Sequence, residues 1–153
     1  MLQEISHIEN KCCRELNFYV YCNSYENFNQ PGFKKIDFNT CKSKFSHLLN
    51  YSSNVFATPE NGVYSFAAGA RVTGVSEGYA GLGLFINDKL HTMMDYTSSE
   101  GGMFFIQGTA SLYLSGGDRV DLRSVSTPDS SCYLFAKTTA SFIWFSGFLI
   151  LKD

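Results

Sequence analysis

The chain has 153 residues and a net charge of −2, with 44% hydrophobic, 17% charged and 16% aromatic residues. This length fits one domain that buries roughly two-thirds of its chain surface and needs no metal or disulfide to hold a core. The absence of a basic stripe argues against nucleic-acid binding, and no apolar stretch approaches the ~20 residues that span a bilayer. Because the charged share lies below the ~25% of ordinary domains, we expect oligomer contacts to cover part of the aromatic surface.

Residues 1–15 are expected to form an N-terminal arm or a short neck before a domain that covers residues 16–153. Apolar residues recur at helical spacing here, although the segment is too short for a coiled coil. Its mixed, polar composition is not that of a signal peptide. The expected location is therefore extracellular, with a signal removed, or the surface of a virion assembled from a cytosol.

The five cysteines leave at least one residue unpaired within the chain. None has the spacing of a metal-binding cluster, so we expect no metal and no other cofactor. Free buried thiols fit better than a disulfide framework, and an interchain disulfide is the alternative for the adjacent pair. The cysteines are Cys12, Cys13, Cys22, Cys41 and Cys132.

From residue 16 the hydrophobic period is two, which predicts β-strands. The first part of the domain is expected to contain a strand at Leu16–Cys22, a loop at Asn23–Gly32, a short extended piece at Lys35–Phe38 and a polar turn at Asn50–Asn54. The clearest strand is Gly62–Gly74. The next strands are Tyr79–Asn87 and, after a hairpin turn at Asn87–Lys89, Leu90–Met94.

The last part is expected to contain strands at Met103–Leu114, Arg119–Val125 and Ser141–Leu151, with a turn at Ser115–Asp118 and a further turn at Thr127–Ser130. An extended piece is expected at Ser131–Ala136. Glycines within the strands indicate bulges or close backbone contacts. Eight to ten short strands without a long helix predict an all-β fold, an antiparallel two-sheet jelly-roll sandwich.

Three ordered motifs add a resemblance to this pattern. Together they resemble the globular-head domain of complement C1q, a jelly roll of the tumour necrosis factor superfamily. The motif positions are Phe56, Pro59, Gly62, Tyr64 and Phe66, then Gly117, Asp118, Val120 and Leu122, and finally Phe145, Gly147 and Phe148. Asn54 stands where a turn glycine is usual, and asparagine tolerates the left-handed conformation well.

The resemblance implies a compact homotrimer with an apolar axis, built on these core and assembly residues. It also implies binding without catalysis. The expected partners are the chain itself and a protein or glycan ligand at a surface. The loops expected to be displayed to this ligand are Asn23–Gly32, Asn87–Lys89, Ser98–Gly102 and Ser126–Ser130. The alternative is a structural virion protein, which uses the same trimer to decorate or cement a capsid lattice or to tip a fibre. Neither nucleic acid nor membrane insertion is expected, and the ligand-binding residues stay unknown.

Two patterns with catalytic or metal-binding potential have simpler explanations. Gly74-Val75-Ser76-Glu77-Gly78 fits a nucleophile elbow in sequence, but it lies between two predicted strands and lacks the following helix. His91 and Asp95 would share a strand face without a third partner, so His91 is expected at a surface or interface. We therefore predict that the chain has no catalytic or metal-binding residues.

Two surface features stay open. Asn50-Tyr51-Ser52 is a glycosylation sequon, which matters only if the chain enters a secretory pathway. Several aromatics, among them Tyr19, Tyr21, Tyr25, Phe28 and Tyr113, could form a contact patch for a sugar or a protein. Sheet packing and a trimer axis explain these aromatics better.

Overall fold

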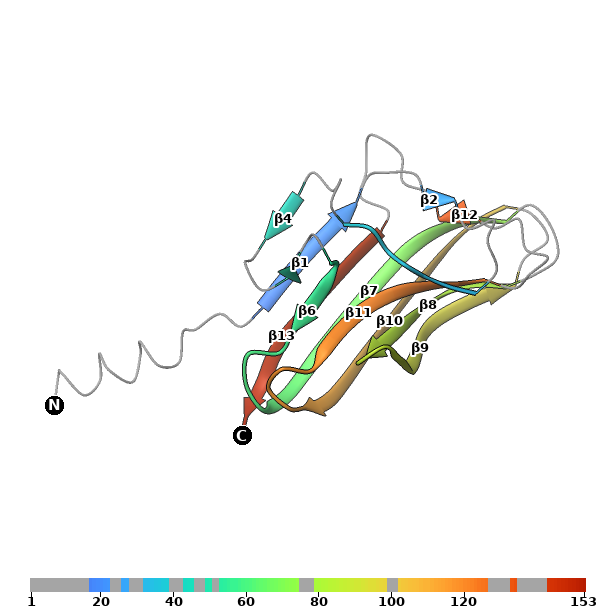
Figure 1. The fold of residues 1–153 in the computed structure, drawn as a ribbon. Coiled ribbons are helices and arrows are strands. Elements are labelled where there is room, and N and C mark those ends of the chain that lie inside the picture. Colours follow the sequence, from blue (N-terminus) through green and yellow to red (C-terminus); the bar gives the residue numbers. More distant parts are fainter. Residues whose placement is uncertain are drawn as a thin grey trace, which may run out of the picture.

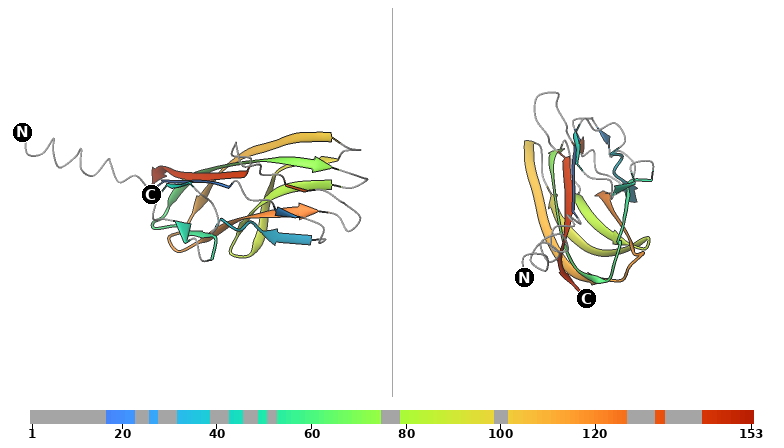
Figure 2. Two further views of the ribbon diagram at one scale, coloured as in Figure 1. Left: turned by 90° about the horizontal axis from the view of Figure 1, so that it is seen from above. Right: turned by 90° about the vertical axis from the view of Figure 1, so that its left-hand side faces the viewer.

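The computed structural model describes residues 17–22, 26–27, 32–38, 43–45, 49–50, 53–74, 79–98, 102–126, 133–134 and 143–153. These residues form two antiparallel β-sheets that pack face to face, and no helix occurs among them (Figures 1 and 2). The all-β, two-sheet sandwich expected from the sequence is therefore confirmed. The expected arm at 1–15 and the residues Cys12, Cys13, Cys41 and Cys132 lie outside the described residues.

The first sheet, sheet A, is organised around β7 (Gly62–Gly74), the strand that the sequence predicted with the same bounds. β10 (Gly102–Leu114) pairs with one edge of β7. β13 (Ile143–Lys152) and the two-residue β12 (Tyr133–Leu134) pair with its other edge. β1 (Asn17–Cys22) pairs with β13, and β4 (Ser43–Phe45) pairs with the other edge of β1. β2 (Glu26–Asn27) pairs with β12.

The second sheet, sheet B, has the order β5-β6-β11-β8-β9, and β3 also pairs with β11. Its strands are β3 (Gly32–Lys35), β5 (Leu49–Asn50), β6 (Val55–Ala57), β8 (Tyr79–Ile86), β9 (Lys89–Ser98) and β11 (Arg119–Ser126). The β8–β9 hairpin turns through Asn87 and Asp88, both of which have positive φ, 50° and 65°. The predicted hairpin turn is thus confirmed.

The core lies between the sheets and follows the period-two pattern. On β7, Tyr64, Phe66, Ala68 and Ala70 alternate with outward residues and are fully or almost fully buried. Aromatic rings from three further strands meet them, with ring centroids 4.8 Å apart for Phe18 and Phe56 and 4.9 Å apart for Phe18 and Phe145. The other large buried side chains are Phe38, Ile36, Leu82, Leu84, Ile106 and Leu122.

Gly147 makes room for this aromatic core. A Cβ atom at residue 147 would lie 2.6 Å from Cε1 of Phe18 and 2.7 Å from Cδ1 of Phe66. Two inward-pointing rings from the neighbouring strands β1 and β7 thus fill the space above the glycine.

One open side of the sandwich is closed where the edge strands β9 and β10 meet. A Cβ atom on Gly108 would lie 2.0 Å from the carbonyl oxygen of Met94, so only glycine permits this approach of the two backbones. The outward amide of Gln107 donates to Oδ2 of Asp95 at 3.0 Å. Since an unpaired strand edge invites aggregation, this contact protects the edge of sheet A.

The sequence placed the first strands less well. It predicted a loop up to Gly32 and an extended piece at Lys35–Phe38, whereas the ladder with β11 runs from Gly32 to Lys35, and Ile36 N–H still donates to the carbonyl of Leu122 at 3.0 Å. Ile36 and Phe38 are both buried, and Phe38 N–H donates to Oδ1 of Asn54 at 2.8 Å. At Phe38 a side chain thus replaces a strand partner, which an alternation pattern cannot show.

Candidate functional site

A hydrogen-bonded clasp joins three turns at the end of the sandwich near the C-terminus (Figure 1). Thr58 N–H donates to the carbonyl of Asp118 at 2.9 Å, and Gly117 N–H donates to the carbonyl of Thr58 at 2.7 Å. The Asp118 carboxylate accepts from Ser115 N–H at 2.8 Å and from Nδ2 of Asn87 at 3.0 Å. The sequence motif therefore places Asp118 where it ties the β6–β7, β8–β9 and β10–β11 connections together.

The glycines of the same motifs serve this clasp through their backbone. Gly117 has a φ of 92°, which strains any residue with a Cβ. A Cβ on Gly62 would lie 2.4 Å from the carbonyl oxygen of Leu151, so Gly62 lets the end of β13 pass. Val120 and Leu122 follow the clasp into the core, fully buried, and Pro59 is exposed at the corner.

We define the assembly face as the outward side chains of β1, β13, β7 and β10. Its middle is made of small residues, including Ser65, Ala67 and Ser146, which lie in neighbouring register. Large hydrophobic side chains surround this middle and are 41–71% exposed. They are Tyr19, Phe105, Tyr113, Phe148, Ile150 and Leu151.

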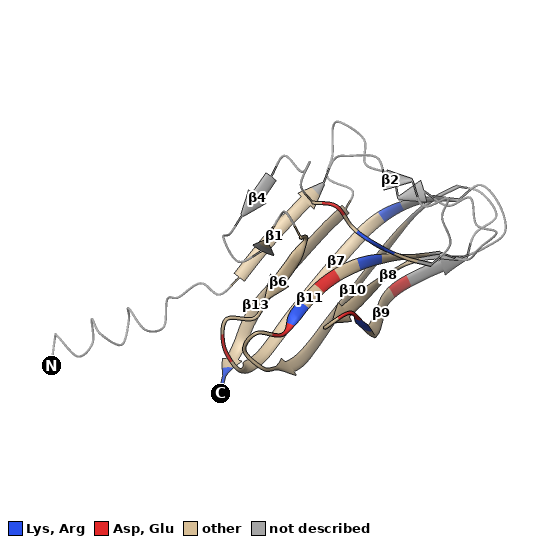
Figure 3. Ribbon diagram, viewed as in Figure 1, with Lys and Arg blue, Asp and Glu red and all other residues tan. Residues whose placement is uncertain are grey.

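Charge is nearly absent from the assembly face (Figure 3). Among its described outward residues, Arg71 at one end is the charged side chain, and its guanidinium lies 5.6 Å from the ring centroid of Phe105. Trp144, the one tryptophan of the sequence, lies over Gly69 on this face. A broad uncharged face with exposed aromatics is the type of surface that protein association covers.

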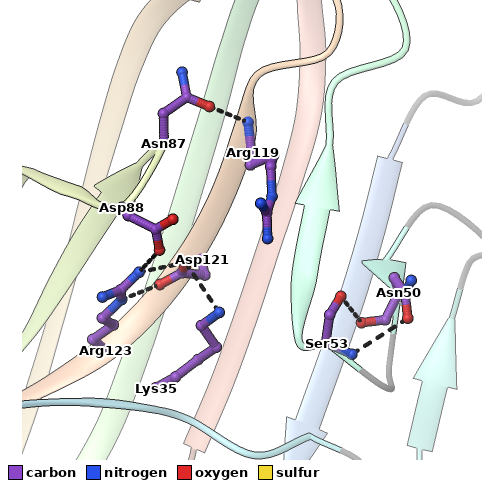
Figure 4. Close-up of polar contacts among 8 residues, drawn as sticks. All are labelled: Lys35, Asn50, Ser53, Asn87, Asp88, Arg119, Asp121 and Arg123. Atoms are coloured by element: carbon purple, nitrogen blue, oxygen red, sulfur yellow. Dashed lines mark hydrogen bonds and ion pairs between the residues drawn. The ribbon is translucent and has the colours of Figure 1, made fainter.

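The outward face of sheet B differs, because it carries an ion-pair network on β11 and its neighbours (Figure 4). Arg123 donates to Asp121 at 2.6 Å and to Asp88 at 2.5 Å, and Lys35 lies 3.7 Å from Asp121. The hydrogen bond to Asp121 raises the pKa of Arg123, while the hydrogen bond from Arg123 lowers the pKa of Asp88. The guanidinium also lies 4.2 Å from the ring centroid of Phe85, so the network fixes Arg123 firmly.

The sequence did not single out this network. Its signal is the alternation of Arg119, Asp121 and Arg123, which puts three charges on one side of a strand. Next to it, Phe33 is 55% exposed and packs edge-on against Phe85. The two sheets therefore present outward faces of opposite character, one apolar and one charged.

The structure gives the other candidate residues ordinary surroundings. Asp95 binds a backbone amide across the sheet edge, and His91 is exposed on β9. No group of three potential metal ligands occurs among the residues that the structure describes. Residues 75–78 of the Gly-x-Ser-x-Gly segment lie outside them, as do most of the loops Asn23–Gly32, Ser98–Gly102 and Ser126–Ser130.

Within the described part of the chain, we find no helix with the length and apolar character needed to cross a membrane.

Comparisons with known proteins agree with this geometry. The family model "C1q domain" matches residues 17–150. The globular domain of zebrafish complement 1qA superposes with a TM-score of 0.58 at 19% identity, covering 92% of this chain and 100% of that one. Murine APRIL superposes with a TM-score of 0.60 at 9% identity, covering 87% and 98%. A search of curated proteins gave no significant match.

Proposed function

Because the chain belongs to the C1q domain family, we propose that it is a homotrimeric, non-enzymatic recognition module that works outside the cell. The observation that carries the proposal is the assembly face. Six large hydrophobic side chains are exposed there around a centre of small residues that lacks charge. A chain that left this face in water would be prone to non-specific association, and a closed trimer removes it from solvent.

The charge distribution supports sheet A as the buried side of this trimer. Burial of the Arg123 network would desolvate the Lys35, Asp88 and Arg123 charges that are still exposed, whereas the centre of the assembly face carries no charged side chain. Three protomers that pack through sheet A would therefore turn the charged face of sheet B and its turns outward. Of the loops expected to bind the ligand, the Asn87–Lys89 turn lies on this side, with its three residues exposed.

Two exposed phenylalanines allow a matched test of the trimer. Phe148 on the assembly face is 50% exposed and Phe33 on sheet B is 55% exposed, so their replacement costs each isolated chain about the same. By light scattering, the wild-type chain should have three times the 17.1 kDa of one chain. We expect Phe148→Asp to dissociate the particle and Phe33→Asp to leave it trimeric.

Trp144 gives an independent readout, because it is the one tryptophan and lies on the assembly face. Dissociation of the Phe148→Asp variant should shift its emission to longer wavelength. A monomeric wild-type chain at micromolar concentration would refute the proposal, and so would equal dissociation by both aspartate variants.

The ligand of the module is proposed to be a protein or a glycan at a surface. A structural protein that caps a virion lattice would use the same trimer, so the oligomer test precedes any test of ligand. Binding of the trimer to purified capsids, unchanged by Asp88→Ala or Phe33→Asp, would favour the lattice role over recognition through sheet B.

A further inference from the structure

We propose that Asn50 is an acceptor site for an N-linked glycan, placed on the side of the sandwich that the trimer leaves open. The inference rests on the extracellular role proposed above, because the transfer reaction occurs in a secretory pathway. Asn50-Tyr51-Ser52 is the one Asn-x-Ser/Thr sequence in the chain. The structure adds the direction, exposure and surroundings of the acceptor residue.

The strand register points Asn50 away from the core. Asn50 pairs with Val55, and the preceding Leu49 pairs with Phe56, which is fully buried between the sheets. Because neighbouring residues of a strand point to opposite faces, Asn50 belongs to the outward face of sheet B. Its side chain is exposed, as acceptance of a bulky group requires.

Asn50 also lies where the chain turns, at the end of β5 and before the residues that lead into β6. Its Oδ1 accepts Ser53 N–H at a long 3.4 Å, and its carbonyl oxygen accepts Ser53 Oγ at 3.4 Å (Figure 4). In contrast, Asn54 and Asn87 use their side chains to hold the segments that pack against them. Modification of Asn54 or Asn87 would therefore remove hydrogen bonds that hold the fold.

The position is compatible with assembly through sheet A. β5 is the end strand of sheet B, and the assembly face belongs to the opposite sheet. A glycan on Asn50 would project outward from each protomer and cover the two-residue end strand of sheet B. It would therefore shield sheet B at this end without reaching the contact between protomers.

The transfer is a substitution without change of oxidation state. Nδ2 of Asn50 forms a bond to the anomeric carbon of a lipid-diphosphate-linked oligosaccharide while the bond from that carbon to the diphosphate oxygen breaks. The amide nitrogen loses one proton, and the lipid diphosphate leaves. The host oligosaccharyltransferase supplies the catalyst, and this chain supplies the acceptor.

The experiment expresses the full chain behind a secretion leader in eukaryotic cells and measures the intact mass of the secreted protein. We expect an added oligosaccharide mass that peptide-N-glycosidase removes, with conversion of Asn50 to aspartate. Asn50→Gln and Ser52→Ala should each abolish the added mass completely, Ser52→Thr should keep it, and the control Asn61→Gln, an exposed asparagine outside any sequon, should also keep it.

Light scattering of the same samples separates this proposal from the trimer. A secreted trimer without added mass, or with the mass on another asparagine, overturns the glycan site and leaves the trimer intact. If the glycosylated chain and Ser52→Ala are both monomeric, the trimer is refuted and the glycan site stands. If the glycosylated chain is monomeric and Ser52→Ala is trimeric, the placement on the open side is overturned.

Discussion

Replacement of Phe66 by alanine tests the packing of the core directly. Phe66 is fully buried, and its ring centroid lies 6.0–6.4 Å from those of Phe18, Phe56, Tyr64 and Phe145. Emptying such a site costs about 3–5 kcal/mol, because the neighbouring rings are held by their own contacts and cannot close the cavity. At about 2–4 °C per kcal/mol for this chain length, the melting temperature should fall by roughly 6–20 °C.

Gly147 makes the test sharper, since a double-mutant cycle can report whether the two residues share one space. Gly147→Ala alone should cost about 1–3 kcal/mol, because its Cβ meets the rings of Phe66 and Phe18. In the Phe66→Ala background, the contacts at 2.7 and 2.8 Å to Phe66 vanish and the one at 2.6 Å to Phe18 remains. The double variant should therefore be more stable than the sum predicts, by about 0.5–3 kcal/mol.

The assay is thermal and chemical unfolding followed by circular dichroism at one fixed protein concentration, because assembly makes stability depend on concentration. Phe33→Ala is the control, since its side chain is exposed on the outward face of sheet B, away from the proposed trimer contact, and leaves the core unchanged. Additive effects of Phe66→Ala and Gly147→Ala, or a melting temperature of Phe66→Ala within about 2 °C of wild type, would refute the shared-space argument.

Two further variants test the strand edge and the clasp end. Gly108→Ala should destabilise the fold by at least the ~1–3 kcal/mol of overpacking and speed hydrogen exchange at Gln107, because its Cβ meets Met94 backbone. Gly83→Ala, whose Cβ meets only side chains at 3.0–3.4 Å, should cost less, and equal costs would contradict this account. Burial raises the pKa of Tyr64 above 10.0, so its stabilising contribution is complete below pH 10 and is lost as pH rises through the folded-state pKa. Tyr64→Phe should cost about 0.5–1.5 kcal/mol at neutral pH, because the hydrogen bond to the carbonyl of Glu60 is lost. The variant should also lose less stability above pH 10 than the wild type. An equal loss of stability above pH 10 in both proteins would contradict this role of Tyr64.

The central strands were predictable because their information is local. Alternation along residues 62–74 places Tyr64 and Phe66 in the core whatever lies around them, and the positive φ of Asn54, 56°, follows from the residue types that tolerate it. The segment 32–38 was predicted only in part, for the opposite reason. Its last residues are held by the side chain of Asn54, a contact across 16 positions that no local pattern encodes.

The candidate site could be predicted only in part, because pattern alone does not say which outward side chains are left without a cover. Tyr19, Tyr113 and Phe148 read as strand aromatics in the sequence. Their position on one face of sheet A depends on the pairing of four strands from distant parts of the chain. The Arg123 network was missed because Asp88, one of its partners, comes from a turn 35 residues away.

Apart from Phe148 on the assembly face and Pro59 at the corner, the motif residues that identify the family lie inside the sandwich or in the clasp, and this separates folding from recognition. Substitutions at Phe66, Gly117 or Asp118 act on the scaffold, so loss of binding in such variants would say nothing about the ligand. Outward residues of sheet B, such as Phe33 and Arg119, contribute little to the core and are free to change with the ligand. A search for the ligand should therefore vary sheet B and its turns on an unaltered trimer, because only there does a change in affinity report contact rather than unfolding.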